Sequence, residues 1–64
     1  SIQHDNAKVK YDVPLSTPPD QDVKTSLMRY EGEVTFYPSF ICLEDKNMWI
    51  PWDKVYSANV TEDK

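Results

Sequence analysis

Apolar and polar residues alternate strictly along segment 7–13, the first clear pattern in the chain. The apolar set is Val9, Tyr11 and Val13, and the polar set between them is Lys8, Lys10 and Asp12. A period of two places each set on one face of an extended chain, which is typical of a half-buried β-strand. Residues 1–6 are mostly polar and lack this period, so we expect a flexible N-terminal arm there.

Prolines interrupt this pattern. Proline cannot donate a hydrogen bond to a neighbouring strand, so the first strand is expected to end at Pro14. Farther along, Thr17 is a residue type that caps helices, Pro18 suits the first helical position, and acidic residues follow. This order predicts a short helical turn near residues 18–25.

Aromatic and apolar residues are densest in segment 34–52, which holds both Phe, both Trp and the single Cys. Two β-prone runs flank the polar segment 44–47, a pattern that predicts a β-hairpin. Continued alternation through the first run would place Val34 and Phe40 on the same face. Pro38 interrupts that run, which indicates an edge strand or a bulge.

Further short strands complete the expected fold. Segment 55–60 predicts a last strand, and the only glycine, Gly32, predicts a turn, a bulge or a close backbone approach. About five short strands and one helical turn indicate a mostly β protein, a small five-stranded SH3-like or Sm-like barrel. We expect one β domain over residues 7–61, followed by a tail at 62–64.

The size of the chain bounds its organisation. Its 64 residues suffice for one domain of marginal stability, so association with a second copy is an open possibility. A single cysteine excludes an intrachain disulfide, which favours a reducing compartment such as the cytoplasm. We expect no signal peptide and no membrane span, because the chain has neither a basic start before an apolar core nor about 18 consecutive apolar residues. The first residue is Ser1, so these residues can be an internal part of a longer protein.

Charge and residue types argue against several kinds of chemistry. A net charge of −4 argues against nucleic acid and favours basic partners. The only histidine, His4, lies among polar residues with no partner cluster, and Cys42 lies in an apolar run typical of a buried side chain. One Cys and one His are too few for a metal site, and no phosphate-binding loop is present. We therefore expect no catalytic group, metal or cofactor.

A binding surface is the remaining expectation. Trp49 and Ile50 are adjacent in a predicted strand, so they point to opposite faces, and Pro51 prevents strand pairing beside them. The two tryptophans could form core and rim, or they could form an aromatic surface beside an exposed strand edge that captures an extended peptide. The predicted binding residues are Tyr37, Ser39, Phe40, Trp49, Trp52 and Tyr56.

Segments 8–13, 27–36, 36–40 and 49–58 carry a resemblance to a known family. Their order resembles the core of the stringent starvation protein B family, whose members read as a strand, a helical turn, a Phe-x-x-x-Phe strand, a hairpin and a last strand pair. Members of that family are adaptors that deliver tagged substrates to the ClpXP protease, and their core is a small Sm-like barrel.

The resemblance implies that the peptide groove is lined by Tyr37, Ser39, Phe40 and segment 49–52. The chain departs from the family where members carry an Arg and a Gly pair around the second Phe. The family's dimer helix and protease-docking tail are also absent from these residues, which puts delivery in doubt. The Sm and Hfq RNA-binding barrels are a second resemblance, but the acidic charge and the lack of a Lys-His or Arg-Gly loop argue against RNA.

We therefore expect a non-catalytic module that binds a protein or an extended peptide, such as an adaptor for a protease or another large machine. One alternative is a small acidic inhibitor or regulatory protein, from a phage or mobile element, that blocks an enzyme. Another is a subunit of a homo-oligomeric assembly.

Overall fold

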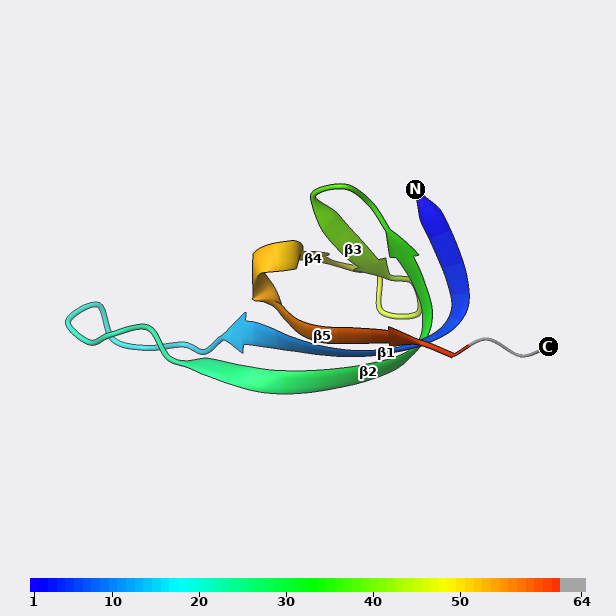
Figure 1. Ribbon diagram of the computed structural model, residues 1–64. Helices are drawn as coiled ribbons and strands as arrows, with labels where there is room; N and C mark the ends of the chain where they lie inside the picture. Colours follow the sequence, from blue (N-terminus) through cyan, green and yellow to red (C-terminus); the bar gives the residue numbers. More distant parts are fainter. Residues whose placement is uncertain (62–64) are drawn as a thin grey trace.

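Five strands form one antiparallel sheet in the computed structural model, which describes residues 1–61 (Figure 1). The elements are β1 (Ile2–Pro14), β2 (Thr25–Phe36), β3 (Phe40–Leu43), β4 (Met48–Pro51), the 3-10 turn η1 (Trp52–Lys54) and β5 (Val55–Val60). The strand order is β4-β3-β2-β1-β5. The predicted mostly β fold is confirmed, with β4 and β5 at the two edges of a sheet that is not closed.

The alternation along β1 gives it a central place in the sheet. β1 pairs with β2 on one side and with β5 on the other, and its apolar side chains Val9 and Tyr11 are almost fully buried. The opposite partner of Val9 on β2 is Tyr30, which is also buried, because directly opposed residues share a face. The core consists of Ala7, Val9, Tyr11, Tyr30, Val34, Ile41, Leu43 and Ile50.

A tight turn at Pro38 and Ser39 joins β2 to β3. The backbone N–H of Tyr37 donates to the carbonyl of Phe40 at 2.9 Å, so the chain reverses within two residues. The reversal places Phe40 on the face opposite Val34, and the prediction that they share a face is wrong. Proline has a fixed φ that suits a turn, so Pro38 ends a strand here and does not bulge one.

The hairpin predicted around residues 44–47 is confirmed. Leu43 and Met48 are opposite partners, and the N–H of Lys46 donates to the carbonyl of Leu43 at 3.1 Å. Asn47 has a φ of 52°, a left-handed conformation that asparagine tolerates better than most residues. The polar segment therefore forms a turn as its composition indicated.

The helical turn predicted near residues 18–25 is wrong. β1 and β2 pair as far as Pro14 and Thr25, and the N–H of Leu15 still donates to the carbonyl of Lys24 at 2.8 Å. The few residues left must reverse the chain, and the prolines and aspartates that suit a helix start suit a turn equally well. In residues 1–61, η1 is the one helical element, and no helix there is long and apolar enough to cross a membrane.

The outer part of the β1–β2 pair extends beyond the body of the molecule (Figure 1). The last contact of β5 with β1 is at Tyr11, so residues 12–27 have no third strand beside them. We call residues 12–27 the projecting hairpin. It contributes to the elongated shape of the molecule, 51 × 19 × 18 Å.

The sheet also begins earlier than the predicted boundary at residue 7. Ile2 and His4, expected in a flexible arm over residues 1–6, belong to β1 and pair with Phe36 and Val34. The register shifts between His4 and Ala7, and this irregularity removes the period-two pattern by which the strand could be seen in the sequence. The tail predicted at residues 62–64 lies outside the described residues.

Candidate binding surface

Three aromatic rings gather on the outer face of β3 and β4. The ring centroids of Tyr37 and Phe40 are 4.8 Å apart, those of Phe40 and Trp49 are 4.9 Å apart, and Tyr37 stacks on Trp49 at 5.9 Å. We call Tyr37, Phe40 and Trp49 the aromatic cluster. Trp49 is 57% exposed, while its neighbour Ile50 is buried, so the predicted split between their faces is confirmed.

The pairing of the strands explains how the cluster forms. Cys42 lies opposite Trp49 on one side and opposite Thr35 on the other, so all three share the outer face. Cys42 and Thr35 are buried although this face is turned away from the core, so neighbouring side chains must cover them. The cluster is therefore seated on packed side chains.

Cys42 is a buried free thiol, as its apolar neighbours indicated. Burial, together with the carboxylate of Glu44, raises the pKa of the thiol above its usual value. The carboxylate of Glu44 also accepts a hydrogen bond from the hydroxyl of Thr35 at 2.6 Å. A raised pKa keeps the thiol protonated, which suits packing and not nucleophilic chemistry.

Trp52 adjoins the aromatic cluster from a different direction. Its indole N–H donates to the backbone carbonyl of Tyr37 at 2.7 Å, while its ring meets Phe36 edge to face at 5.3 Å. His4 lies against the same Phe36 ring at 4.8 Å. With 37% of its surface exposed, Trp52 acts mainly to fix the turn that carries the cluster.

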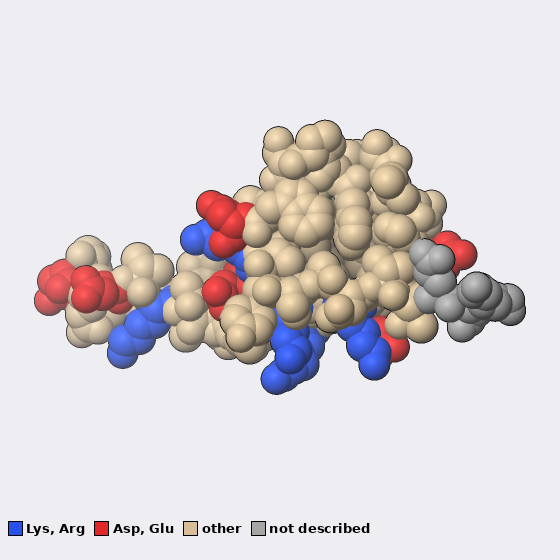
Figure 2. Space-filling view, in the orientation of Figure 1, with Lys and Arg blue, Asp and Glu red and all other residues tan. Residues whose placement is uncertain are grey.

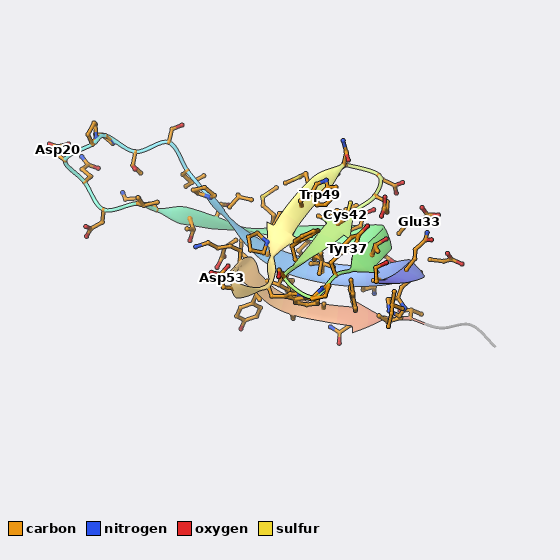
Figure 3. The ribbon with its side chains drawn as sticks, turned by 90° about the horizontal axis from the view of Figure 1, so that it is seen from above. Asp20, Glu33, Tyr37, Cys42, Trp49 and Asp53 are labelled. Atoms are coloured by element: carbon orange, nitrogen blue, oxygen red, sulfur yellow. The ribbon has the colours of Figure 1, made fainter. Side chains whose placement is uncertain are left out.

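The other two predicted residues have different places. Ser39 is exposed in the β2–β3 turn next to the cluster, and its carbonyl accepts a hydrogen bond from the N–H of Trp52 at 3.4 Å. Tyr56 is 72% exposed on β5, at the opposite edge of the sheet from β4, and makes no ring contact with another aromatic side chain of residues 1–61. The structure therefore groups Tyr37, Phe40 and Trp49, places Ser39 and Trp52 beside them and leaves Tyr56 apart. Figure 3 shows Tyr37 and Trp49 of this group from above.

An open strand edge lies beside the cluster. The N–H of Trp52 donates to the carbonyl of Ser39, and these two residues continue the register of the β3–β4 pair. Ser39 and Trp52 are therefore a hydrogen-bonded pair of this ladder. Bonded positions alternate in an antiparallel pair, so the backbone groups of Trp49 and Pro51 point away from β3, toward the open edge. Pro51 has no N–H, which leaves one donor, from Trp49, and two carbonyl acceptors along this edge.

The upper part of the molecule in the view of Figure 2, where β3 and β4 lie, shows no Lys, Arg, Asp or Glu side chain, and these lie at its two sides, below it and on the projecting hairpin. An exposed aromatic surface with few charges is typical of a protein interface. The arrangement can bind apolar side chains of a partner and can offer a few main-chain hydrogen bonds.

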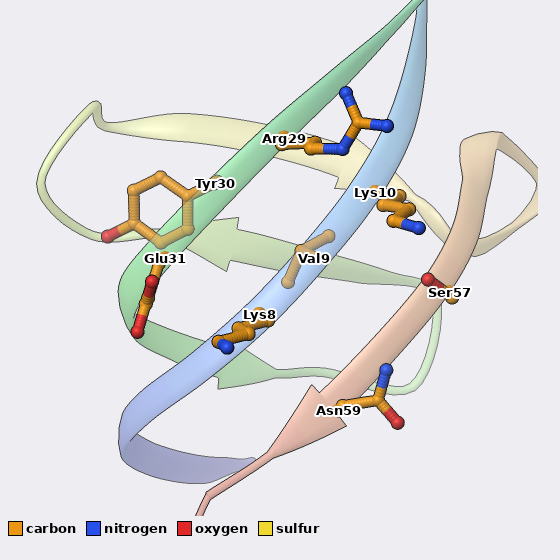
Figure 4. Close-up of a pocket in the computed structure, with 8 residues that line it drawn as sticks. All are labelled: Lys8, Val9, Lys10, Arg29, Tyr30, Glu31, Ser57 and Asn59. Carbon is orange, nitrogen blue, oxygen red and sulfur yellow. The ribbon is translucent and has the colours of Figure 1, made fainter.

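A second surface, on the outer face of β1, β2 and β5, was not predicted as a site. It is an open hollow of about 530 Å³ whose exposed charged residues are Lys8, Lys10, Arg29 and Glu31, with Ser57 and Asn59 beside them (Figure 4). We call it the basic face. Alternation had already placed Lys8 and Lys10 together, but pairing with β2 was needed to set Arg29 opposite Lys10.

Within residues 1–61, no three His, Cys, Asp or Glu side chains lie close enough to hold a metal ion. Comparison with known protein families, with curated proteins and with solved structures found no match. The geometry of the two surfaces therefore has to support any functional assignment.

Proposed function

We propose that this protein is a non-catalytic module that binds an extended peptide segment of a partner protein, as an adaptor for a protease or another large machine would. The observation that supports it is the aromatic cluster, in which Trp49 is exposed and Tyr37 and Phe40 are half-buried, directly beside the open edge of β4. Aromatic side chains provide large contact areas at small cost in side-chain entropy, and they are enriched where partners bind most strongly.

In the proposed complex, the peptide pairs with β4 as an added strand. Its main chain bonds to the N–H and C=O of Trp49 and to the C=O of Pro51, and alternate peptide side chains lie on the aromatic cluster. The free edge spans only β4, from Met48 to Pro51, so we expect recognition of a short stretch in which apolar side chains alternate. The aromatic rings of the cluster favour apolar or aromatic side chains at these positions.

The five short antiparallel strands support the proposal that the fold is related to the SH3-like or Sm-like barrels. Both forms were expected with a short helical turn near residues 18–25, where the chain forms a loop. The helical turn instead lies at Trp52–Lys54, directly before the last strand. The relation to the stringent starvation protein B family remains a proposal that rests on the residues of segments 8–13, 27–36, 36–40 and 49–58.

A peptide selected from a random displayed library tests the proposal. Titration of the labelled protein with the peptide, followed by NMR, should shift the amide and indole signals of Trp49 most strongly. Trp49→Ala should weaken binding about tenfold or more, because it removes the most exposed ring of the cluster. Tyr56→Ala, which removes an even more exposed aromatic residue on β5, should leave the affinity unchanged.

Failure to select any peptide would count against the proposal. Equal weakening by the two substitutions would contradict it as well, because the aromatic cluster would then have no special part in binding. Each variant is compared with the wild type by its NMR spectrum, so that loss of fold is distinguished from loss of the contact.

A further inference from the structure

The projecting hairpin has apolar side chains that the described chain covers only in part. Within residues 1–61, four of the eight large hydrophobic residues exposed on the surface belong to it or to its base. They are Leu15, Val23, Leu27 and Met28. A two-stranded ribbon is only marginally stable in water without a further layer or strand. The exposed aliphatic residues therefore indicate a surface that is covered in an assembly.

The basic face lies at the inner end of the same ribbon. Lys8 and Lys10 alternate along β1, Arg29 is the opposite partner of Lys10 on β2, and all three side chains are exposed (Figure 4). Among the residues that line the hollow, Glu31 is the one carboxylate. Three of the seven cationic side chains of an acidic protein are thus concentrated here.

The outer end of the ribbon has the opposite charge. Asp20 and Asp22 are exposed in its loop, and Asp20 marks the far end in Figure 3. Lys24, the one cation of the projecting hairpin, lies closer to the body, opposite Leu15. From tip to body, the ribbon therefore presents an acidic loop, then a section with aliphatic residues on both faces, and then the basic face. Leu27 shares the face of Lys10 and Arg29, with the half-buried Asp12 opposite it, while Met28 lies on the other face.

This order is self-complementary under a two-fold rotation. When two ribbons lie antiparallel with the faces of Lys10 and Arg29 together, the acidic tip of each meets the basic face of the other, and Leu27 of both copies lies between these two contacts. The tip and the basic face are separated by about ten residues, roughly 30 Å of extended chain, which is the same in both copies. Such a contact uses the same surface twice and closes as a dimer.

We propose that two copies of this chain associate through their projecting hairpins, with Asp20 and Asp22 of each copy on the basic face of the other. The occupant of the basic face is then a second copy. A nucleic acid fits less well, because three cations neutralise few phosphates and a net charge of −4 repels the rest of a polyanion. The aliphatic section would also have no partner on a phosphate backbone.

Charge reversal tests the proposal with the full chain. The variants are Asp20→Lys with Asp22→Lys, and Lys10→Glu with Arg29→Glu, both at exposed positions. Sedimentation velocity is recorded for each variant and for an equimolar mixture, at low salt where charges act over more than about 10 Å. Each variant alone brings like charges together and should associate at least about tenfold more weakly than the wild type.

The mixture gives the decisive result. In a mixed dimer both tips again face the opposite charge, so association should return to within about threefold of the wild-type dissociation constant. The control is Lys46→Glu with Lys54→Glu, at exposed positions outside the ribbon. It changes the net charge by the same amount as Lys10→Glu with Arg29→Glu, and it should associate more strongly than that variant. If a charge-reversal variant does not fold, a variant with Asn or Gln at the same ribbon positions takes its place. Each of these neutral variants should also associate more weakly than the wild type.

A wild type that stays monomeric at the highest soluble concentration would overturn the proposal, and so would a mixture that stays monomeric while the wild type associates. The aromatic cluster takes no part in this contact. Trp49→Ala should therefore dimerise like the wild type, and the peptide-binding proposal can fail without affecting this one.

Discussion

At the scale of single residues, Gly32 shows how closely one position is constrained. Its φ is +153°, a value that residues with a side chain rarely adopt. An added Cβ would lie 2.9 Å from the hydroxyl oxygen of Tyr30 and 3.0 Å from a carboxylate oxygen of Asp45. The hydroxyl of Tyr30 donates to the carbonyl of Glu33 at 2.9 Å and accepts from the N–H of Asp45 at 3.2 Å. Gly32 therefore permits a contact that ties β2 to the β3–β4 turn.

Gly32→Ala should destabilise the protein by about 2 kcal/mol, because it combines backbone strain with displacement of the Tyr30 hydroxyl. Urea unfolding followed by tryptophan fluorescence measures the change in the free energy of unfolding. Ser39→Ala, in an exposed turn, is the control and should stay within about 0.5 kcal/mol of the wild type. A Gly32→Ala variant as stable as the control would show that the backbone relaxes there.

At the scale of elements, alternation and polar gaps predicted the strands well. The period-two pattern of segment 7–13 and the polar residues 44–47 correspond to a strand and a turn in the structure. Prediction was wrong at the prolines. Pro18 suits a helix start and a loop equally well, and Pro38 suits both a bulge and a two-residue turn. Long-range strand pairing decided between these forms, and a local pattern does not contain it.

The candidate site was predicted only as far as neighbouring sequence allows. Tyr37, Phe40 and Trp49 were expected together and do meet, because two short hairpins bring them onto one face. Tyr56 was grouped with them on residue type, yet β5 lies at the other edge of the sheet. The basic face was missed for a related reason, since Arg29 joins Lys10 only through the pairing of β1 with β2.

The projecting hairpin can be tested as an element. In a shortened variant, Asn-Gly replaces residues 16–23, so that Leu15 and Lys24 keep their hydrogen bond around a two-residue turn. The core contains no residue of the deleted segment, so the free energy of unfolding of the monomer should change by about 1 kcal/mol or less. Self-association should be lost, as measured by sedimentation. A shortened variant that fails to fold would show that the loop stabilises the sheet.

At the scale of the whole molecule, small size makes association matter for stability. A chain of 64 residues buries only about 60% of the surface that it exposes when unfolded, so its own stability is marginal. A partner that binds only the folded form adds stability in proportion to the logarithm of its concentration. For a dimer, the partner concentration is the protein concentration itself.

The melting temperature should therefore rise with protein concentration, by about 3 °C for each tenfold increase in the range where the dimer is populated. Scanning calorimetry over two decades of concentration measures the rise. Because oppositely charged ends drive the contact, about 0.5 M salt should reduce the rise, as should the Asp20→Lys, Asp22→Lys variant. A melting temperature independent of concentration in dilute salt would contradict the dimer.

The position of β1 between β2 and β5 also has a consequence during synthesis of the protein. A ribosome makes β1 first and β5 last among the strands, so one edge of β1 stays bare until Val60 has emerged. Contacts between distant parts of a chain form slowly, and a bare edge in the meantime can pair with another nascent chain. The pairing of β5 with β1, which completes the sheet, is therefore the folding step at which misassembly competes most.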